Sequence, residues 1–126
     1  MLVGKLADDG AYFSWMDDGF KVDILLDGNV DAADLEVGDS IITLPTGERY
    51  IALLITLDQI SRIMDRHQRS GENLSGRYFG TPDLIVVREK GVAAMVDVIR
   101  DIVTSGDLPT WLPRIRENDQ LDLLEM

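Results

Sequence analysis

Three aspartate–glycine steps divide the N-terminal part of the chain into short, evenly spaced segments. Gly10, Gly19 and Gly28 each follow an aspartate and lie nine residues apart. The Asp-Gly pair is typical of tight β-hairpin turns, because glycine adopts positive φ angles at no steric cost. Segments of this length leave room for strands of about six residues, so the spacing predicts an antiparallel β-meander.

The residues between these turns alternate between apolar and polar, which is typical of half-buried strands. In residues 20–26 the apolar side chains share one face: Phe20, Val22, Ile24 and Leu26. In residues 11–16 the alternation places Tyr12 and Trp15 on opposite faces of a strand. Further strands are predicted at residues 40–44, 49–56 and 83–88, and residues 50–55 are apolar on both faces, as in a central strand.

The second half of the chain changes to a helical period. Thr56 and Gln59 resemble a capping box that opens a helix, and Gly71 is expected to end it. His67 is expected to be a solvated residue near the end of this helix. A second amphipathic helix is predicted over residues 92–105, and a rigid extended segment over residues 108–113. If the strands before and after the first helix pair in parallel, the sheet is mixed.

These patterns predict an α+β fold, in which an antiparallel, mostly meander β-sheet of about five to six strands carries two amphipathic helices packed on it. The chain of 126 residues fits one domain, which we place at residues 1–113. Residues 114–126 are polar and acidic, and we expect them to form a C-terminal tail with partial disorder.

Negative charge is concentrated at the two ends of the sequence. Residues 1–40 hold ten acidic and two basic residues, residues 41–100 hold seven and eight, and residues 101–126 hold six and two, within a total charge of −11. This sign argues against direct binding to nucleic acid or to an anionic membrane. The chain contains no cysteine, which excludes disulfides and thiol catalysis, and we expect no cofactor and no metal. We expect a cytoplasmic protein, because neither an apolar leader nor a membrane-spanning run is visible.

Turn chemistry explains most of the aspartates one by one, but it does not explain why so few lysines and arginines accompany them in residues 1–40. An exposed aromatic side chain among acidic residues is a suitable anchor for a protein partner. The candidate partner-binding residues are therefore Asp8, Asp9, Tyr12, Trp15, Asp17, Asp18, Asp27, Asp31 and Asp34.

This asymmetry favours a small acidic protein-binding module with a basic partner, because complementary charge steers association. Immunity and inhibitor proteins that neutralise toxin nucleases follow the same logic, since the active clefts of those nucleases are positively charged. The prediction is a binding protein of that class and not an enzyme.

Two alternatives remain open. Residues Asp23–Asp34 resemble half of a calcium-binding loop of the EF-hand or dockerin kind, with acidic residues at the first, fifth, ninth and twelfth positions and Gly28 at the sixth. The resemblance implies a small-ligand or calcium-binding domain, although Leu25 occupies a position where such loops carry an oxygen ligand. The further alternative is an enzyme with a site made only of carboxylates, which ranks last because no motif marks a nucleophile or an oxyanion donor.

Overall fold

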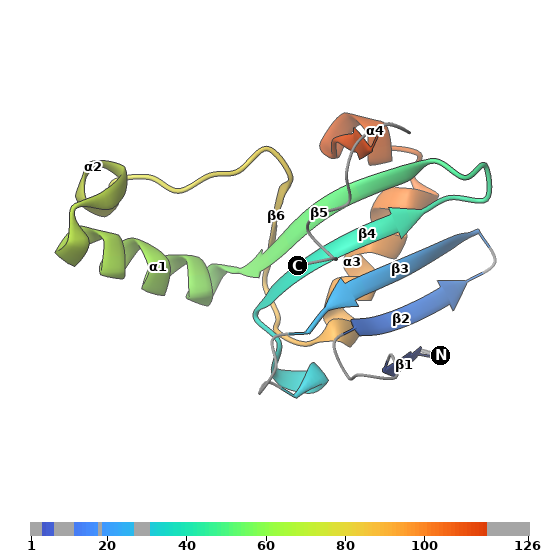
Figure 1. Ribbon diagram of the computed structural model, residues 1–126, viewed down its shortest axis with the longest axis horizontal. Helices are drawn as coiled ribbons and strands as arrows, with labels where there is room; N and C mark the ends of the chain where they lie inside the picture. Colours follow the sequence, from blue (N-terminus) through green and yellow to red (C-terminus); the bar gives the residue numbers. More distant parts are fainter. Residues whose placement is uncertain (1–3, 7–11, 18, 27–30, 116–126) are drawn as a thin grey trace.

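The computed structural model describes residues 4–6, 12–17, 19–26 and 31–115 (Figure 1). The strands are β1 (Gly4–Leu6), β2 (Tyr12–Asp17), β3 (Phe20–Leu25), β4 (Val37–Thr43), β5 (Arg49–Thr56), β6 (Leu84–Val87) and β7 (Arg114–Ile115). The helices are the 3₁₀ turn η1 (Ala32–Asp34), α1 (Leu57–Ser70), α2 (Glu72–Gly76), α3 (Val92–Thr104) and α4 (Leu108–Trp111).

The strands form one sheet in the order β1-β2-β3-β4-β5-β6. Each of the first four strands is antiparallel to the next, and this confirms the predicted α+β fold with a meander sheet. β6 lies parallel to the second half of β5, so the sheet is mixed. β7 pairs antiparallel with the beginning of β5, on Arg49 and Tyr50. Two different segments thus pair with β5 along its length.

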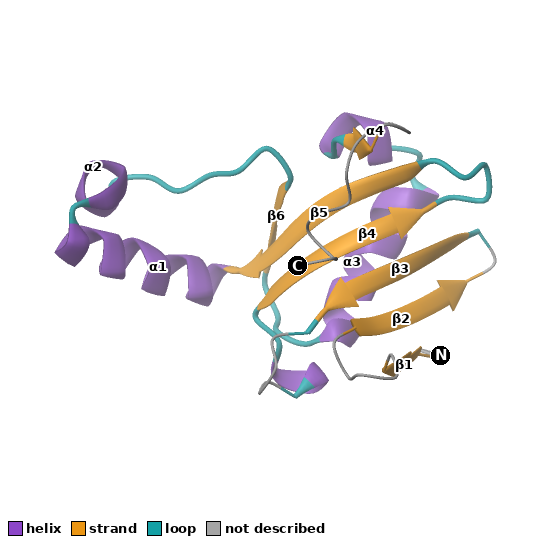
Figure 2. Ribbon diagram, in the orientation of Figure 1, coloured by secondary structure: helices purple, strands orange, loops and turns teal. Residues whose placement is uncertain are grey.

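The hydrophobic core lies between the sheet and α3, which covers one face of the sheet (Figure 2). Alternate residues of the strands point into this core. Each fully buried valine, leucine, isoleucine or methionine side chain stabilises the fold by roughly 1.5–3 kcal/mol. The largest fully buried core side chains are Val22, Ile24, Leu35, Ile42, Leu54, Met95, Val96 and Ile99.

Gly38 sets how closely α3 approaches β4. A methyl group on Gly38 would lie 2.8 Å from Met95 Sδ and 3.2 Å from Ile24 Cγ2. Met95 therefore packs directly against the backbone of Gly38. The next residue, Asp39, points to the opposite face of the sheet. That opposite face is not covered by any helix of the described part of the chain (Figure 2).

The predicted ends of α1 are confirmed. The Thr56 side chain accepts a hydrogen bond from the Gln59 backbone N–H at 3.1 Å, which is the first half of the predicted capping box. The second half is absent, because the Gln59 side chain accepts from Arg62 and the Thr56 backbone N–H donates to the Glu36 carbonyl. Gly71 ends the helix with φ 89°.

The two long helices differ in where they lie, and this refines the expectation that both pack on the sheet. α3 covers the sheet, whereas α1 continues beyond the end of β5 and projects away from it (Figure 1). We call residues 57–80 the arm; they comprise α1, α2 and the start of the return to β6. None of the described helices is long and apolar enough to cross a membrane.

The end of the domain differs in detail from the prediction. Residues 108–111 form the short helix α4, not an extended segment. Pro109 is tolerated there because the first turn of a helix does not use its backbone N–H groups. Arg114 and Ile115 join the sheet as β7, two residues into the segment assigned to the tail, and residues 116–126 lie outside the described residues.

Candidate protein-binding surface

Four of the nine predicted partner-binding residues fall outside the described part of the chain: Asp8, Asp9, Asp18 and Asp27. Asp17 is the last residue of β2 and pairs with Phe20 at the β2–β3 turn. The remaining four occupy three separate environments, which are the core for Trp15, the uncovered face of the sheet for Tyr12, and η1 with the residue before it for Asp31 and Asp34.

Trp15 is a core residue, which corrects its selection as a surface anchor. Its side chain is only 2% exposed. Its ring centroid lies 5.4 Å from that of Phe20, and the Arg100 guanidinium carbon lies 4.8 Å from the ring centroid. Strand alternation puts Trp15 on the same face as Phe13 and Val22, which is the face that α3 covers.

Tyr12 lies on the opposite face of β2 from Trp15, at the start of the strand. It pairs with Leu25, the last residue of β3, and its side chain is half-buried. Of the two aromatic residues that the sequence indicated, Tyr12 is therefore the one on the face that no described helix covers.

Described acidic residues gather where β3 ends and β4 begins. Asp31 and Asp34 are exposed, and Glu36 is half-buried directly before β4. We call these three residues the acidic end. Lys90, from the connection between β6 and α3, lies with its Nζ 3.0 Å from Asp34 Oδ1, and this contact raises the pKa of Lys90. The acidic end therefore borders the start of α3.

The topology brings the end of β1 and the start of β2 to the same end of the sheet. Leu6 of β1 pairs with Phe13, and Tyr12 pairs with Leu25, so β1 ends and β2 begins beside the end of β3. Asp8, Asp9 and Asp27 themselves lie outside the described residues. Asp17 lies at the far end of β2. Among the described candidates, Asp31 and Asp34 therefore lie near one end of the sheet and Asp17 lies at the other.

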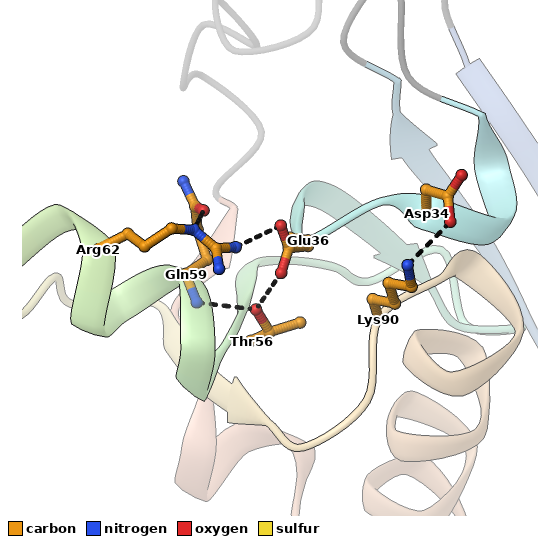
Figure 3. A network of polar contacts seen from close by, with 6 residues as sticks. All are labelled: Asp34, Glu36, Thr56, Gln59, Arg62 and Lys90. Atoms are coloured by element: carbon orange, nitrogen blue, oxygen red, sulfur yellow. Dashed lines mark hydrogen bonds and ion pairs between the residues drawn. The ribbon is translucent and has the colours of Figure 1, made fainter.

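A polar network joins the acidic end to the arm (Figure 3). Glu36 Oε1 accepts a hydrogen bond from Thr56 Oγ1 at 3.3 Å, and Glu36 Oε2 forms an ion pair with the Arg62 guanidinium. Gln59 Oε1 in turn accepts from Arg62 Nε at 3.0 Å. Glu36 therefore contacts both Thr56, which caps α1, and Arg62 in the second turn of α1. These contacts fix the base of the arm to the sheet.

One side of the arm forms an open groove of about 800 Å³ between α1 and the end of α2. Its apolar lining comes from Leu57, Ile60 and Met64, which follow one another at helical spacing. The remaining lining residues are polar or small: Asp58, Ser61, Asp65, Gln68, Ser75, Gly76 and Arg77. Leu57 is 57% exposed, so this apolar stripe is open to solvent.

The tip of the arm is a left-handed turn. Asn73, Leu74 and Ser75 have φ angles of 50°, 52° and 57°, which L-residues rarely adopt. The turn packs directly on α1, because a methyl group on Gly76 would lie 2.2 Å from the Met64 carbonyl oxygen. Leu74 is 70% exposed at the apex. Backbone strain of this kind persists only where the surrounding structure enforces it.

His67 is buried at 8% exposure, which corrects the expectation of a solvated residue. Its Nδ1 lies 3.5 Å from Asn73 Nδ2, and its Nε2 lies 3.4 Å from Glu72 Oε2. Both contacts come from the segment that follows α1. His67 therefore ties α1 to the tip of the arm.

The segment that resembles a calcium loop has other partners at its described ends. Asp23 Oδ1 accepts a hydrogen bond from Ser14 at 2.5 Å, and Lys21 lies 3.6 Å from Oδ2. Asp34 pairs with Lys90. The residues before the loop form a strand, whereas an EF-hand loop follows a helix. Among the described residues, no group of three or more acidic or histidine side chains is placed to hold a metal ion.

The surroundings of Asp39 displace its pKa. Partial burial on the uncovered face of the sheet raises the pKa of its carboxyl group, and the negative charge of Asp83 raises it further. Asp83 itself accepts a hydrogen bond from Thr81 at 3.0 Å.

Comparison of the chain with protein-family models, with curated proteins and with solved structures found no match.

The sequence did not indicate the arm as a surface. The apolar stripe of α1 predicts a helix that covers the sheet, as amphipathic helices usually do. One signal was present in the sequence: Tyr78 and Phe79 follow α1 within a polar stretch, where aromatic residues are unusual. In the structure Leu74 and Tyr78 are exposed, so the arm displays apolar side chains on more than its groove.

Proposed function

We propose that this protein is a small acidic protein-binding module that acts in the cytoplasm on a basic protein partner. The observation that carries the proposal is the acidic end, where Asp31, Asp34 and Glu36 gather between β3 and β4, beside the end of β1 and the start of β2. A surface with an excess of negative charge attracts a partner of the opposite sign and accelerates their encounter.

The position of the acidic end supports this role. Lys90 holds the Asp34 carboxylate and Arg62 holds the Glu36 carboxylate, so the direction of both groups is fixed. Acidic residues still outnumber basic ones in residues 1–40. The arm begins at the same end of the sheet, because Ile55 at the end of β5 pairs with Val37 at the start of β4. A partner at the acidic end therefore meets the base of the arm as well.

The specific form of the proposal is an immunity or inhibitor protein. A toxin nuclease has a positively charged cleft for its substrate, and an acidic protein that covers this cleft blocks it. In this form the purified partner loses its nuclease activity when an equimolar amount of the chain is added.

The binding proposal is tested with a basic protein captured by the full chain from a lysate and then purified. The double variant Asp31→Asn, Asp34→Asn is compared with the wild type by measuring association rates between about 50 and 300 mM salt. We expect the variant to associate roughly three- to tenfold more slowly at low salt and to depend less on salt, because part of the steering charge is gone.

The matched control is the double variant Asp101→Asn, Asp107→Asn, which removes the same charge at and just beyond the far end of α3, where both residues are exposed. We expect this control to associate at nearly the wild-type rate. Equal slowing in both variants would mean that only net charge matters, and unchanged rates in the first variant would remove the acidic end from the interface.

A further inference from the structure

We propose that the groove on the arm binds an amphipathic helix of the partner, with apolar side chains against Leu57, Ile60 and Met64 and basic side chains toward Asp58 and Asp65. This inference rests on the proposed function and specifies the kind of segment that the basic partner presents. It assigns a role to the part of the fold that projects from the sheet.

The apolar stripe has the spacing and length that a helix requires. Leu57, Ile60 and Met64 lie three and four residues apart, so they form one row along α1. The lining runs from Leu57 to Gln68 along α1, which corresponds to roughly 17 Å of helix axis and to about three turns of a bound helix. Helix-in-groove recognition reads such rows of apolar anchors.

Small residues in the lining leave room for a second backbone to approach α1 closely. Ser61 lies between the apolar residues of α1, and Ser75 and Gly76 form part of the opposite wall. Gly76 already packs on the Met64 carbonyl, so this wall is fixed against α1. A wall that is already in place reduces the ordering cost of binding.

The charges of the lining select and orient the ligand. Asp58 and Asp65 are seven residues apart on α1 and therefore lie along the same side of the helix. Arg77 lines the groove from the other segment. A bound helix with lysine or arginine along one side of its apolar row and an acidic residue along the other matches this arrangement. The groove and the acidic end thus favour the same basic partner.

The test uses two synthetic helical peptides of about 14 residues, with leucines at helical spacing. One carries lysines beside the leucines and the other carries glutamates at the same positions. Fluorescence anisotropy against the full chain is expected to show the lysine peptide binding at least about tenfold more tightly, a difference of about 1.4 kcal/mol. The variant Asp58→Asn, Asp65→Asn is expected to reduce this preference to less than about threefold.

Leu57→Ser is expected to weaken both peptides at least about fivefold, because the substitution removes an exposed apolar contact. The control Trp111→Ser changes an exposed apolar residue of α4 outside the groove and is expected to leave both affinities unchanged. A thermal melt of each variant checks that it is folded.

Equal affinity of the two peptides, or equal weakening by Trp111→Ser, would overturn the groove proposal. A concentration-dependent dimer that Leu57→Ser abolishes would show that a second copy occupies the groove, which also overturns it. If the peptides fail to bind while the Asp31 and Asp34 variant still slows association of the purified partner, the groove inference falls and the proposed function stands.

Discussion

The Glu36 carboxylate forms an ion pair with the Arg62 guanidinium across the junction between the sheet and α1. Glu36 also accepts a hydrogen bond from the Thr56 side chain, which caps the same helix. These contacts connect the residue before β4 to the first turns of the arm. They hold the acidic end in a fixed position relative to α1, which lines the groove.

A double-mutant cycle tests this junction. Glu36→Gln and Arg62→Gln are expected to show a coupling free energy of about 0.5 kcal/mol at low salt, because both side chains are partly exposed. The coupling, measured from denaturant unfolding, should shrink at about 1 M salt, where the Debye length is about 3 Å. The control is a cycle of Glu36→Gln with Arg66→Gln, one turn further along α1. Equal coupling in the two cycles would contradict a specific pair.

The left-handed turn at the tip predicts an unusual response to glycine. Leu74→Gly is expected to preserve stability or to raise the free energy of unfolding by up to about 1 kcal/mol, because glycine adopts the φ of 52° without a steric penalty. Leu74→Val should lower it, since a β-branched side chain tolerates positive φ poorly. Denaturant unfolding distinguishes the two variants. A loss with glycine as large as the loss with valine would show that this residue does not hold a left-handed conformation.

Asp39 gives a prediction for the pH dependence of stability. Its pKa is raised in the folded protein, so folding is favoured when the carboxyl group is protonated and is penalised when it is ionised. Asp39→Asn should therefore raise the free energy of unfolding at pH 7 by about 0.5 kcal/mol, after allowance for solvent screening. The gain should fade as the pH falls. It should vanish below the ordinary pKa of 3.8, where the Asp39 carboxyl group is protonated in both the folded and the unfolded protein.

Unfolding curves of the wild type and Asp39→Asn over this pH range measure the effect. Asp83→Asn is the informative companion, because it removes the neighbouring charge but leaves Asp39 partly buried. It should produce a smaller gain at neutral pH. A destabilising Asp39→Asn at pH 7 would mean that the ionised carboxylate has a favourable partner.

The two tryptophans provide an independent check on the packing. Trp15 is 2% exposed and Trp111 is 58% exposed. In the variant Trp111→Phe the remaining fluorescence should resist quenching by acrylamide, whereas in Trp15→Phe it should be quenched readily. Similar quenching in the two variants would place Trp15 on the surface and reinstate it as a candidate contact residue.

Local patterns were sufficient to predict most of the fold. Alternation in residues 20–26, the cap at Thr56 and the stop at Gly71 depend on neighbouring residues, and the structure has each of them. The direction of α1 depends on contacts distant in sequence, such as Glu36 with Arg62, and no periodicity reveals these. The contacts of His67 likewise depend on the left-handed turn that follows α1. Non-glycine residues such as Asn73 and Leu74 form this turn, so no glycine pattern in the sequence indicates it.

The candidate surface was predicted less completely. Period-two alternation correctly separated Tyr12 from Trp15, but which of the two faces is covered depends on where α3 packs. Grouping the acidic residues required strand pairing, because the register of β2 with β3 decides which turns share an end of the sheet. The groove requires the turn at residues 73–76 to lie on α1, which spacing alone does not predict.

The central claim is that a basic partner contacts the acidic end together with the base of the arm. Hydrogen–deuterium exchange of the full chain, with and without the purified partner, tests this claim most directly. We expect slower exchange in residues 31–36 and 57–65 and no change in residues 101–107 at the far end of α3. Slower exchange confined to residues 101–107, or to the β4–β5 turn at residues 44–48, would contradict the account.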